Sequence, residues 1–321
     1  MNNSKSGVTY LFKYLIRRLL VALPTMFITL SIIFFTLRVL PGDPALAILG
    51  DNASAEALYN LREQMGLNVP IWEQYLVFFV DILRGNFGLS IASGTPVLQL
   101  IANNFGATMF LTAASIFIGS LIGIPAGIIS ALRPNSFIDV VVRMVSFLWV
   151  SVPAFLLGIV LMLVFSLKVD WFPSMGAGEG FGGMLYHLIL PSLTLGLINS
   201  AVIMRVARAS LLEEVNQDYI RTAKAKGVPS GIVIFKHALR NSLIPVITVI
   251  GLDITALISG AVITETIFSR PGLGSLAVGA ITSRDFPILQ GCLVLFAILV
   301  IIVNLVIDIA YSIVNPKIRP S

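Results

Sequence analysis

Charged residues are scarce in this sequence. Asp, Glu, Lys and Arg make up 12% of its 321 residues, whereas an average soluble domain carries roughly 25%. Hydrophobic residues account for 57%, and the mean hydropathy is +0.95. A chain with so little charge cannot cover its apolar surface in water. The composition therefore excludes an ordinary water-soluble protein and indicates an integral membrane protein.

Cysteine and histidine are also nearly absent. The single cysteine, Cys292, lies in an apolar run, so the chain can form no internal disulfide, and one thiol cannot build a zinc site. We expect Cys292 to pack in the core. The two histidines, His187 and His237, fall on opposite sides of the predicted bilayer and cannot share a catalytic or metal site. We predict no metal-binding residues.

The motifs of common catalytic sites are missing as well. A P-loop needs Gly-Lys followed by Ser or Thr, and the sequence contains no Gly-Lys pair. The G-x-S-x-G and H-E-x-x-H patterns are absent too. The net charge of +5 could suggest nucleic-acid binding, but membrane proteins need basic loops for orientation, and few exposed aromatics are available to stack on bases. We therefore expect no catalytic residue and no cofactor in this chain.

Long apolar runs are what the sequence has instead. A helix needs roughly 20 apolar residues to cross the hydrocarbon core, and the first run is too long for the apolar part of a cleavable signal peptide. The pattern predicts an all-α bundle of six transmembrane helices. The predicted spans are residues 19 to 37, 105 to 132, 144 to 167, 187 to 204, 242 to 264 and 286 to 307.

The basic residues between these spans predict their orientation. With the N-terminus inside, fifteen Lys and Arg residues fall in cytoplasmic segments and six in external ones. Positively charged loops resist translocation. Both termini are therefore predicted to be cytoplasmic.

The longest external segment, residues 38 to 100, predicts two helices. Ser54 can cap a first helix that runs to about Met65, and a second helix follows Pro70 and ends at Gly85. Two interpretations stay open for this excursion. It is either a lid that stabilises the bundle or a docking surface for an external partner protein.

The longest cytoplasmic segment, residues 205 to 241, contains seven basic and three acidic residues. Strong helix formers from Leu211 to Lys226 predict a helix, and Gly227 followed by Pro229 predicts a turn before the next helix. Charge alone would indicate no more than a topology signal. The order of the residues adds a second interpretation.

Polar residues inside the spans are the candidates for a transport pathway. Asp253 is the most costly of them, at roughly 2.5 to 3.5 kcal/mol for an acid at mid-span. Thr248, Gly251, Thr255 and Ser259 share one stripe of the fifth span, and Asp253 lies on another face. Either face could line the pathway. Glycines at 119, 123 and 127 predict close packing of the second span against a neighbouring helix.

One string identifies a family. The segment R-T-A-K-A-K-G-V-P-S-G-I-V-I-F-K-H-A-L-R-N-S-L-I-P, residues 221 to 245, resembles the coupling motif of ABC importer permeases, which reads E-A-A, three residues, Gly, nine residues and I-x-L-P. Ala223, Gly227 and Leu239 match that form. Departures from it at residues 221, 222, 237 and 240 resemble the dipeptide and oligopeptide branch. Segments that resemble the same branch in order are residues 14 to 19, 38 to 44, 265 to 274 and 315 to 319.

This resemblance implies a single permease domain over residues 1 to 321, of the type I importer kind, in a bacterial or archaeal cytoplasmic membrane. It implies a sister permease subunit as heterodimer partner, two ATPase subunits that bind ATP and Mg, and an external solute-binding protein. The residues it assigns to ATPase coupling are Arg221, Thr222, Ala223, Lys224, Gly227, His237 and Leu239.

The cargo stays open between dipeptides, longer peptides, glutathione, nickel complexes and oligosaccharides. Two rival classes also stay open. One is an ion-coupled secondary carrier that uses Asp253 or Glu265, and the other is a membrane scaffold that transports nothing.

Overall fold

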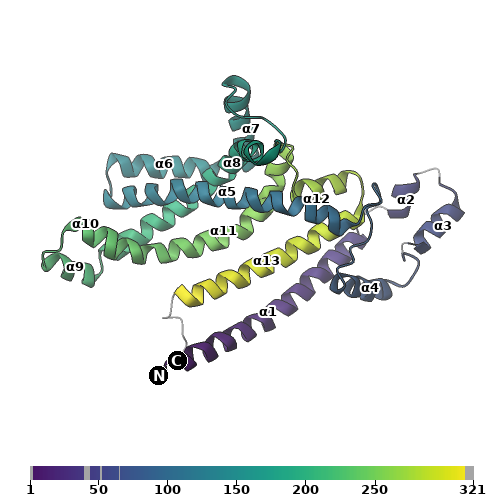
Figure 1. Ribbon diagram of the computed structural model, residues 1–321, viewed down its shortest axis with the longest axis horizontal. Coiled ribbons are helices and arrows are strands. Elements are labelled where there is room, and N and C mark those ends of the chain that lie inside the picture. The colour runs from purple at the N-terminus through teal and green to yellow at the C-terminus, as the bar shows by residue number, and fades with distance from the viewer. Residues whose placement is uncertain (1–2, 40–43, 51–52, 65, 315–321) are drawn as a thin grey trace. The chain divides into compact units, whose positions relative to one another are not determined.

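The computed structural model describes residues 3–39, 44–50, 53–64 and 66–314. These residues form helices joined by turns, with one isolated β-bridge between Leu89 and Pro96 (Figure 1). Residues 40 to 43, Met65, both chain ends and the segment 315 to 319 lie outside the described residues. The α-helices are α1 (Asn3–Val39), α2 (Pro44–Leu49), α3 (Ala55–Gln64), α4 (Ile71–Leu83), α5 (Val97–Leu132), α6 (Phe137–Ser151), α7 (Ala154–Met162), α8 (Gly180–Val215), α9 (Asp218–Ala225), α10 (Ser230–Ile232), α11 (Leu239–Ile267), α12 (Leu273–Thr282) and α13 (Phe286–Val314).

Five helical stretches of the described chain are long and apolar enough to span a membrane, or six if one bent pair counts as a span. The five are Leu20–Val39, Val97–Leu132, Gly180–Val215, Ser230–Ile267 and Phe286–Ile307. They cover five of the six spans predicted from the sequence, apart from residue 19 at the start of the first. The architecture is therefore the all-α membrane bundle that the hydropathy predicts.

The remaining predicted span, residues 144 to 167, is not one straight helix. Phe137–Ser151 and Ala154–Lys168 meet at an angle of 105°. Val152 is extended (φ −87°, ψ 127°), because the ring of Pro153 disfavours helical geometry in the residue before it. Proline also has no N–H to donate to the preceding turn. The apolar run carried no sign of the bend other than Pro153 itself.

The contacts divide the chain into two compact units, which are described separately. Unit 1 comprises Met1–Thr108 and Pro271–Ile301, and unit 2 comprises Met109–Arg270 and Ile302–Ser321. The single permease domain stays a prediction. In unit 1, Cys292 is fully buried in a cluster with residues of α5 and α12, which confirms its packing role.

The segment of unit 1 that the charges predict to be external forms the two predicted helices in its described part. The backbone N–H of Ala57 donates to Ser54 Oγ at 3.2 Å, so Ser54 caps α3. Helix α4 begins directly after Pro70 and ends just before Gly85, whose φ of +70° suits glycine.

The glycine repeat of unit 2 lies where α5 crosses α8. A Cβ at Gly123 would lie 2.6 Å from the carbonyl oxygen of Ser200, and one at Gly127 would lie 2.7 Å from the Cβ of Ala207. No side chain fits at such distances. The repeat is thus a packing device, as its spacing predicts.

Candidate coupling surface and polar residues of the spans

The chain turns sharply after α8. The predicted helix over residues 211 to 226 is in fact two helices, because α8 ends at Val215 and α9 begins at Asp218. Asn216 Nδ2 donates to the carbonyl oxygen of Leu212 at 2.8 Å, and Gln217 is extended. This local side-chain bond competes with continuation of the helix. The break directs Ile220 toward the bundle.

Helix α9 is held by an apolar anchor. Ile220 is fully buried in a cluster with Leu211 of α8 and Ala131 of α5, together with two residues from the π-helical stretch Val233–Ala238. Burying one such side chain stabilises the folded state by about 1.5 to 3 kcal/mol. The anchor therefore fixes α9 to the ends of two spanning helices of unit 2.

A polar lock adds to this anchor. The Tyr219 hydroxyl donates to the carboxylate of Glu214, and Asn241 Nδ2 donates to Glu214 Oε1 at 3.2 Å and to the Tyr219 oxygen at 3.0 Å. Burial raises the pKa of Tyr219, and its bond to the Glu214 carboxylate raises it further. The phenol therefore stays protonated at neutral pH and keeps donating. The lock joins α8, α9 and α11.

The outer face of α9 is charged and exposed. Arg221, Thr222, Lys224 and Gly227 all lie on the surface. Arg221 Nη1 approaches Asp218 Oδ1 only at 3.9 Å, and both side chains are well exposed. Such a pair contributes no more than about 0.5 kcal/mol, so the basic groups remain available to a partner. Gly227 has φ +77°, and a Cβ there would meet nothing within 4 Å.

The other predicted coupling residues are less accessible. Ala223 is half-buried and packs against the apolar anchor. His237 and Leu239 are also half-buried, in the π-helical stretch and at the start of α11. The structure thus leaves Arg221, Thr222, Lys224 and Gly227 exposed and places the other three in half-buried positions.

A buried ion pair next to this surface was not predicted. Asp139 of α6 is 0% exposed and receives Arg208 Nε at 2.8 Å and Arg208 Nη2 at 2.9 Å. The hydroxyl of Ser130 and the backbone N–H of Asn135 also donate to it. A carboxylate with this many donors is satisfied despite burial. The group ties α5, α6 and α8 together.

Sequence patterns could have indicated a helix start near Asp139 but not its pairing with Arg208. Ser136 caps α6 by accepting the backbone N–H of Asp139 at 3.2 Å, which is the Ser-x-x-acid pattern of a helix start. Arg208 is 69 residues away from Asp139, so no local pattern connects them. Ser130 adjoins Ala131 of the apolar anchor, and Arg208 lies one turn from Leu211. The ion pair and the anchor therefore act on the same helix ends.

The predicted pathway residues of α11 have mixed surroundings. A Cβ at Gly251 would lie 3.1 Å from Ile307, so this glycine packs against α13 within unit 2. Thr248 Oγ1 donates to the carbonyl oxygen of Ile244, and Ser259 is exposed. Asp253 Oδ2 and Thr255 Oγ1 are buried and have no hydrogen-bond partner among the described residues. Which face lines a pathway stays a prediction.

Solved structures share this fold. The chain matches an inward-facing structure of the MetNI methionine ABC transporter with a TM-score of 0.57 and 20% identity, over 68% of this chain and 97% of that one. It also matches a crystal structure of an amino acid ABC transporter with a TM-score of 0.53 and 14% identity, over 67% of this chain and 94% of that one. The fold is that of an ABC importer permease.

Sequence relatives define the family. Residues 123–320 match the binding-protein-dependent transport system inner membrane component, and residues 11–112 match the N-terminal component of the same systems. A protein of Sinorhizobium fredii described as the "Probable peptide ABC transporter permease protein y4tP" is 40% identical over 95% of this chain and 99% of its own length. The glutathione transport system permease protein GsiC of Escherichia coli is 40% identical over 96% and 99%.

The chain therefore belongs to the family of binding-protein-dependent transport system inner membrane components. It is a multi-pass inner-membrane permease subunit of an ABC importer, not an enzyme. Permeases of this family work with ATPase subunits and a solute-binding protein.

Proposed function

We propose that this chain forms half of the translocation pathway for di- or oligopeptides that an external solute-binding protein delivers. Support for the cargo comes from two relatives whose names refer to peptides and to glutathione, which is itself a modified tripeptide. Each is 40% identical across nearly the whole chain. A sister permease supplies the other half, in the heterodimer that the sequence resemblance implies.

The observation that carries the coupling role is the charged outer face of α9 on its buried anchor. The exposed residues Arg221, Thr222 and Lys224 contact the ATPase, and Gly227 allows its surface to approach. Ala223, His237 and Leu239 support these contacts from their half-buried positions. The charges mainly orient the partner, while close fit supplies affinity.

Force then passes from α9 into the spans. When two ATPase subunits bind ATP and close, they draw the α9 helices of the two permeases together. The apolar anchor and the Asp139–Arg208 pair transmit that movement to α5, α6 and α8. The permease interface opens outward and accepts cargo, and hydrolysis on the ATPases resets it. In this scheme both termini of the chain are cytoplasmic.

The test is reconstitution in vesicles. The permease pair, both ATPases and the loaded binding protein should show peptide-stimulated ATP hydrolysis and ATP-dependent uptake. The permease pair without ATPases should show neither activity. Uptake by the permeases alone, driven by a proton or sodium gradient, would replace this proposal with an ion-coupled carrier.

A further inference from the structure

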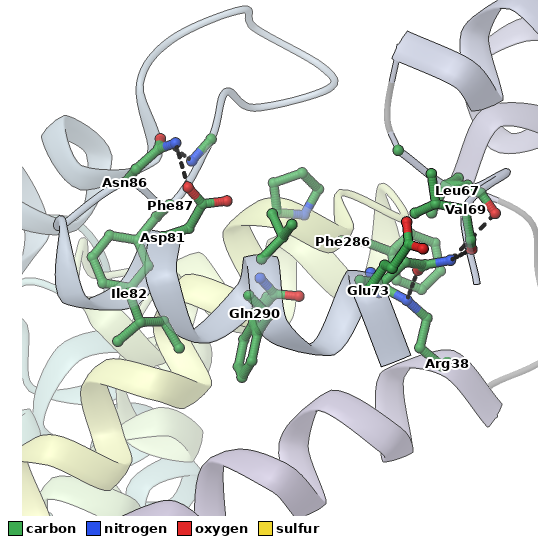
Figure 2. A pocket seen from close by; sticks show the side chains of 16 residues that line it. Arg38, Leu67, Val69, Glu73, Asp81, Ile82, Asn86, Phe87, Phe286 and Gln290 are labelled. Carbon is green, nitrogen blue, oxygen red and sulfur yellow. Dashed lines mark hydrogen bonds between the residues drawn. The ribbon is translucent and has the colours of Figure 1, made fainter. Parts of the chain in front are cut away.

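Unit 1 contains a cavity of 410 Å³ between the end of α1, helix α4 and the beginning of α13 (Figure 2). Its wall carries charge of both signs, from Arg38, Glu73 and Asp81. Side-chain amides of Gln74, Asn86 and Gln290 complete the polar part of the wall. None of these residues takes part in the proposed coupling or pathway.

The cavity lies at the level where two spans leave the membrane core. Arg38 is the last residue but one of the span Leu20–Val39, and Phe286, which also lines the cavity, begins the span Phe286–Ile307. The ends of apolar spans mark the boundary between acyl chains and headgroups. The cavity is therefore at headgroup depth.

Helix α4 supports this placement. Phe78 is buried in a cluster with Leu30 and Phe34 of α1, so one face of α4 packs on the spans. Trp72 and Leu76, one helical turn apart, are 60% and 58% exposed. A helix that packs on one face and presents large apolar side chains on another is typical of the membrane interface. Acyl chains would lie beside the cavity.

The guanidinium of Arg38 is held in place at one end of the cavity. Its Nε donates to Gln74 Oε1 at 2.9 Å, and Gln74 Nε2 donates to the carbonyl oxygen of Val69 at 2.9 Å (Figure 2). The guanidinium carbon lies 4.9 Å from the ring centre of Phe34. No bond among the described residues uses the terminal nitrogens of Arg38. These nitrogens are preorganised to bind an anionic group.

The two carboxylates lie two turns apart on α4. Asp81 Oδ1 accepts Asn86 Nδ2 at 3.2 Å, and Glu73 has no side-chain partner within the described part of the chain. Neither acid forms an ion pair with Arg38. The cavity therefore has two acids and one base that do not neutralise one another, so a suitable occupant carries a cationic group and a separate anionic group.

We propose that this cavity binds the headgroup of an aminophospholipid such as phosphatidylethanolamine. Its phosphate pairs with Arg38, and its primary ammonium donates a hydrogen bond to Glu73, which is the neighbour of the Arg38 partner Gln74. Asp81 lies eight residues further along α4, about 12 Å away, and is out of reach of the same ammonium. A primary ammonium has three donors, whereas the trimethylammonium of phosphatidylcholine has none. The site therefore discriminates between two zwitterionic headgroups. This inference needs the membrane placement of the chain but not its peptide cargo.

The test is native mass spectrometry of the detergent-purified transporter with added lipid. We expect phosphatidylethanolamine to bind about tenfold more tightly than phosphatidylcholine or phosphatidylglycerol, because a charge-assisted hydrogen bond contributes roughly this factor. Glu73→Gln should remove the preference for the primary amine, and Arg38→Gln should weaken all phospholipids. Asp81→Asn changes an acid of the same cavity that the ammonium cannot reach, so it should leave the preference intact. Glu63→Gln is the matched control, because Glu63 is exposed on α3 and does not line the cavity.

Equal binding of the three lipids would overturn the proposal, as would a preference for phosphatidylethanolamine that survives Glu73→Gln. A further outcome would also overturn it. If Glu73→Gln leaves lipid binding unchanged but weakens association with the binding protein, the cavity accepts a basic side chain of that protein. Lipid binding is read without transport, so failure here leaves the coupling proposal standing.

Discussion

Gly227 has a backbone conformation that few side chains tolerate. Its φ of +77° falls in the left-handed region, while the space around its Cα is open. An L-residue there costs about 1 to 2 kcal/mol of local strain but meets no atom of its own chain. Substitution effects at this position should therefore come mainly from the partner protein.

We predict that Gly227→Glu weakens association with the ATPase subunits by about tenfold or more, because clashes and unpaired charges at an interface cost several kcal/mol. Membrane insertion and pairing with the sister permease should be normal. Gly227→Asn separates charge from bulk, since asparagine tolerates positive φ and carries no charge, and it should weaken association less than Gly227→Glu. Copurification of all subunits measures the effect. If the Glu variant retains both ATPases and stimulated hydrolysis, the assigned coupling surface is wrong.

Asp253 gives a second prediction at this scale. Its Oδ2 is buried without a partner among the described residues, and an acid retained in a span is costly unless it has a polar task. Asp253→Leu should reduce peptide uptake severalfold more than it reduces the yield of assembled transporter. Thr248→Val on the same helix tests the other candidate face, where the Thr248 hydroxyl bonds to the carbonyl oxygen of Ile244. Unchanged uptake by the Leu variant would make Asp253 a packing residue.

At the scale of elements, the Asp139–Arg208 pair should determine how firmly the ends of α5, α6 and α8 are joined. Asp139→Asn leaves Arg208 without its counter-charge, and loss of one partner of a buried pair costs about 3 to 5 kcal/mol. We predict a lower Tm and less transport per ATP hydrolysed. Arg143 also lies within ion-pair distance of Asp139, at 3.3 Å, but its side chain is 47% exposed. Exposed ion pairs contribute little to stability, so Arg143→Gln should change Tm little. If the two variants have the same Tm and the same transport per ATP, the Asp139–Arg208 pair does not hold these helix ends together.

The close packing of α5 against α8 can be tested by adding a methyl group at a tight glycine and at an open one of the same helix. Gly123→Ala places a Cβ 2.6 Å from the carbonyl oxygen of Ser200, and overpacking of this kind costs about 1 to 3 kcal/mol. Gly106→Ala on the same helix meets nothing within 4 Å and should be neutral or slightly stabilising. Thermal unfolding in detergent compares the two. A neutral Gly123→Ala would mean that the helices can separate at no cost.

These elements show what the sequence could and could not predict. Features that depend on residues close together in sequence were predicted correctly: the apolar spans, the cap at Ser54 and the glycine repeat. The 105° bend before Pro153 and the break before Asp218 were missed, because apolar runs and helix formers continue through both positions. The Arg208–Asp139 contact was missed because it joins residues far apart in sequence. Local chemistry is visible in a sequence, whereas pairing across the bundle requires coordinates.

For the whole molecule, we predict six membrane crossings with both termini in the cytoplasm, since basic residues gather on one side of the spans by fifteen to six. Reporter fusions at residues 60, 175 and 321 should be external, external and cytoplasmic. A fusion at residue 225 in the coupling segment should be cytoplasmic too, and it becomes external if the bent pair does not cross the membrane. An external signal at residue 321 would contradict the topology and require the bent pair to be re-entrant.

Helix α9 has eight residues, and isolated helices shorter than about 12 to 15 residues are marginal in water. Its shape depends on Ile220 reaching a cluster to which α5, α8 and the π-helical stretch all contribute. The surface we propose for the ATPase is therefore built only after distant parts of unit 2 have assembled. A nascent or misassembled permease would present no such surface. If the ATPase docks on α9 as we propose, its recruitment would depend on the folding of unit 2, and incomplete transporters would not bind it.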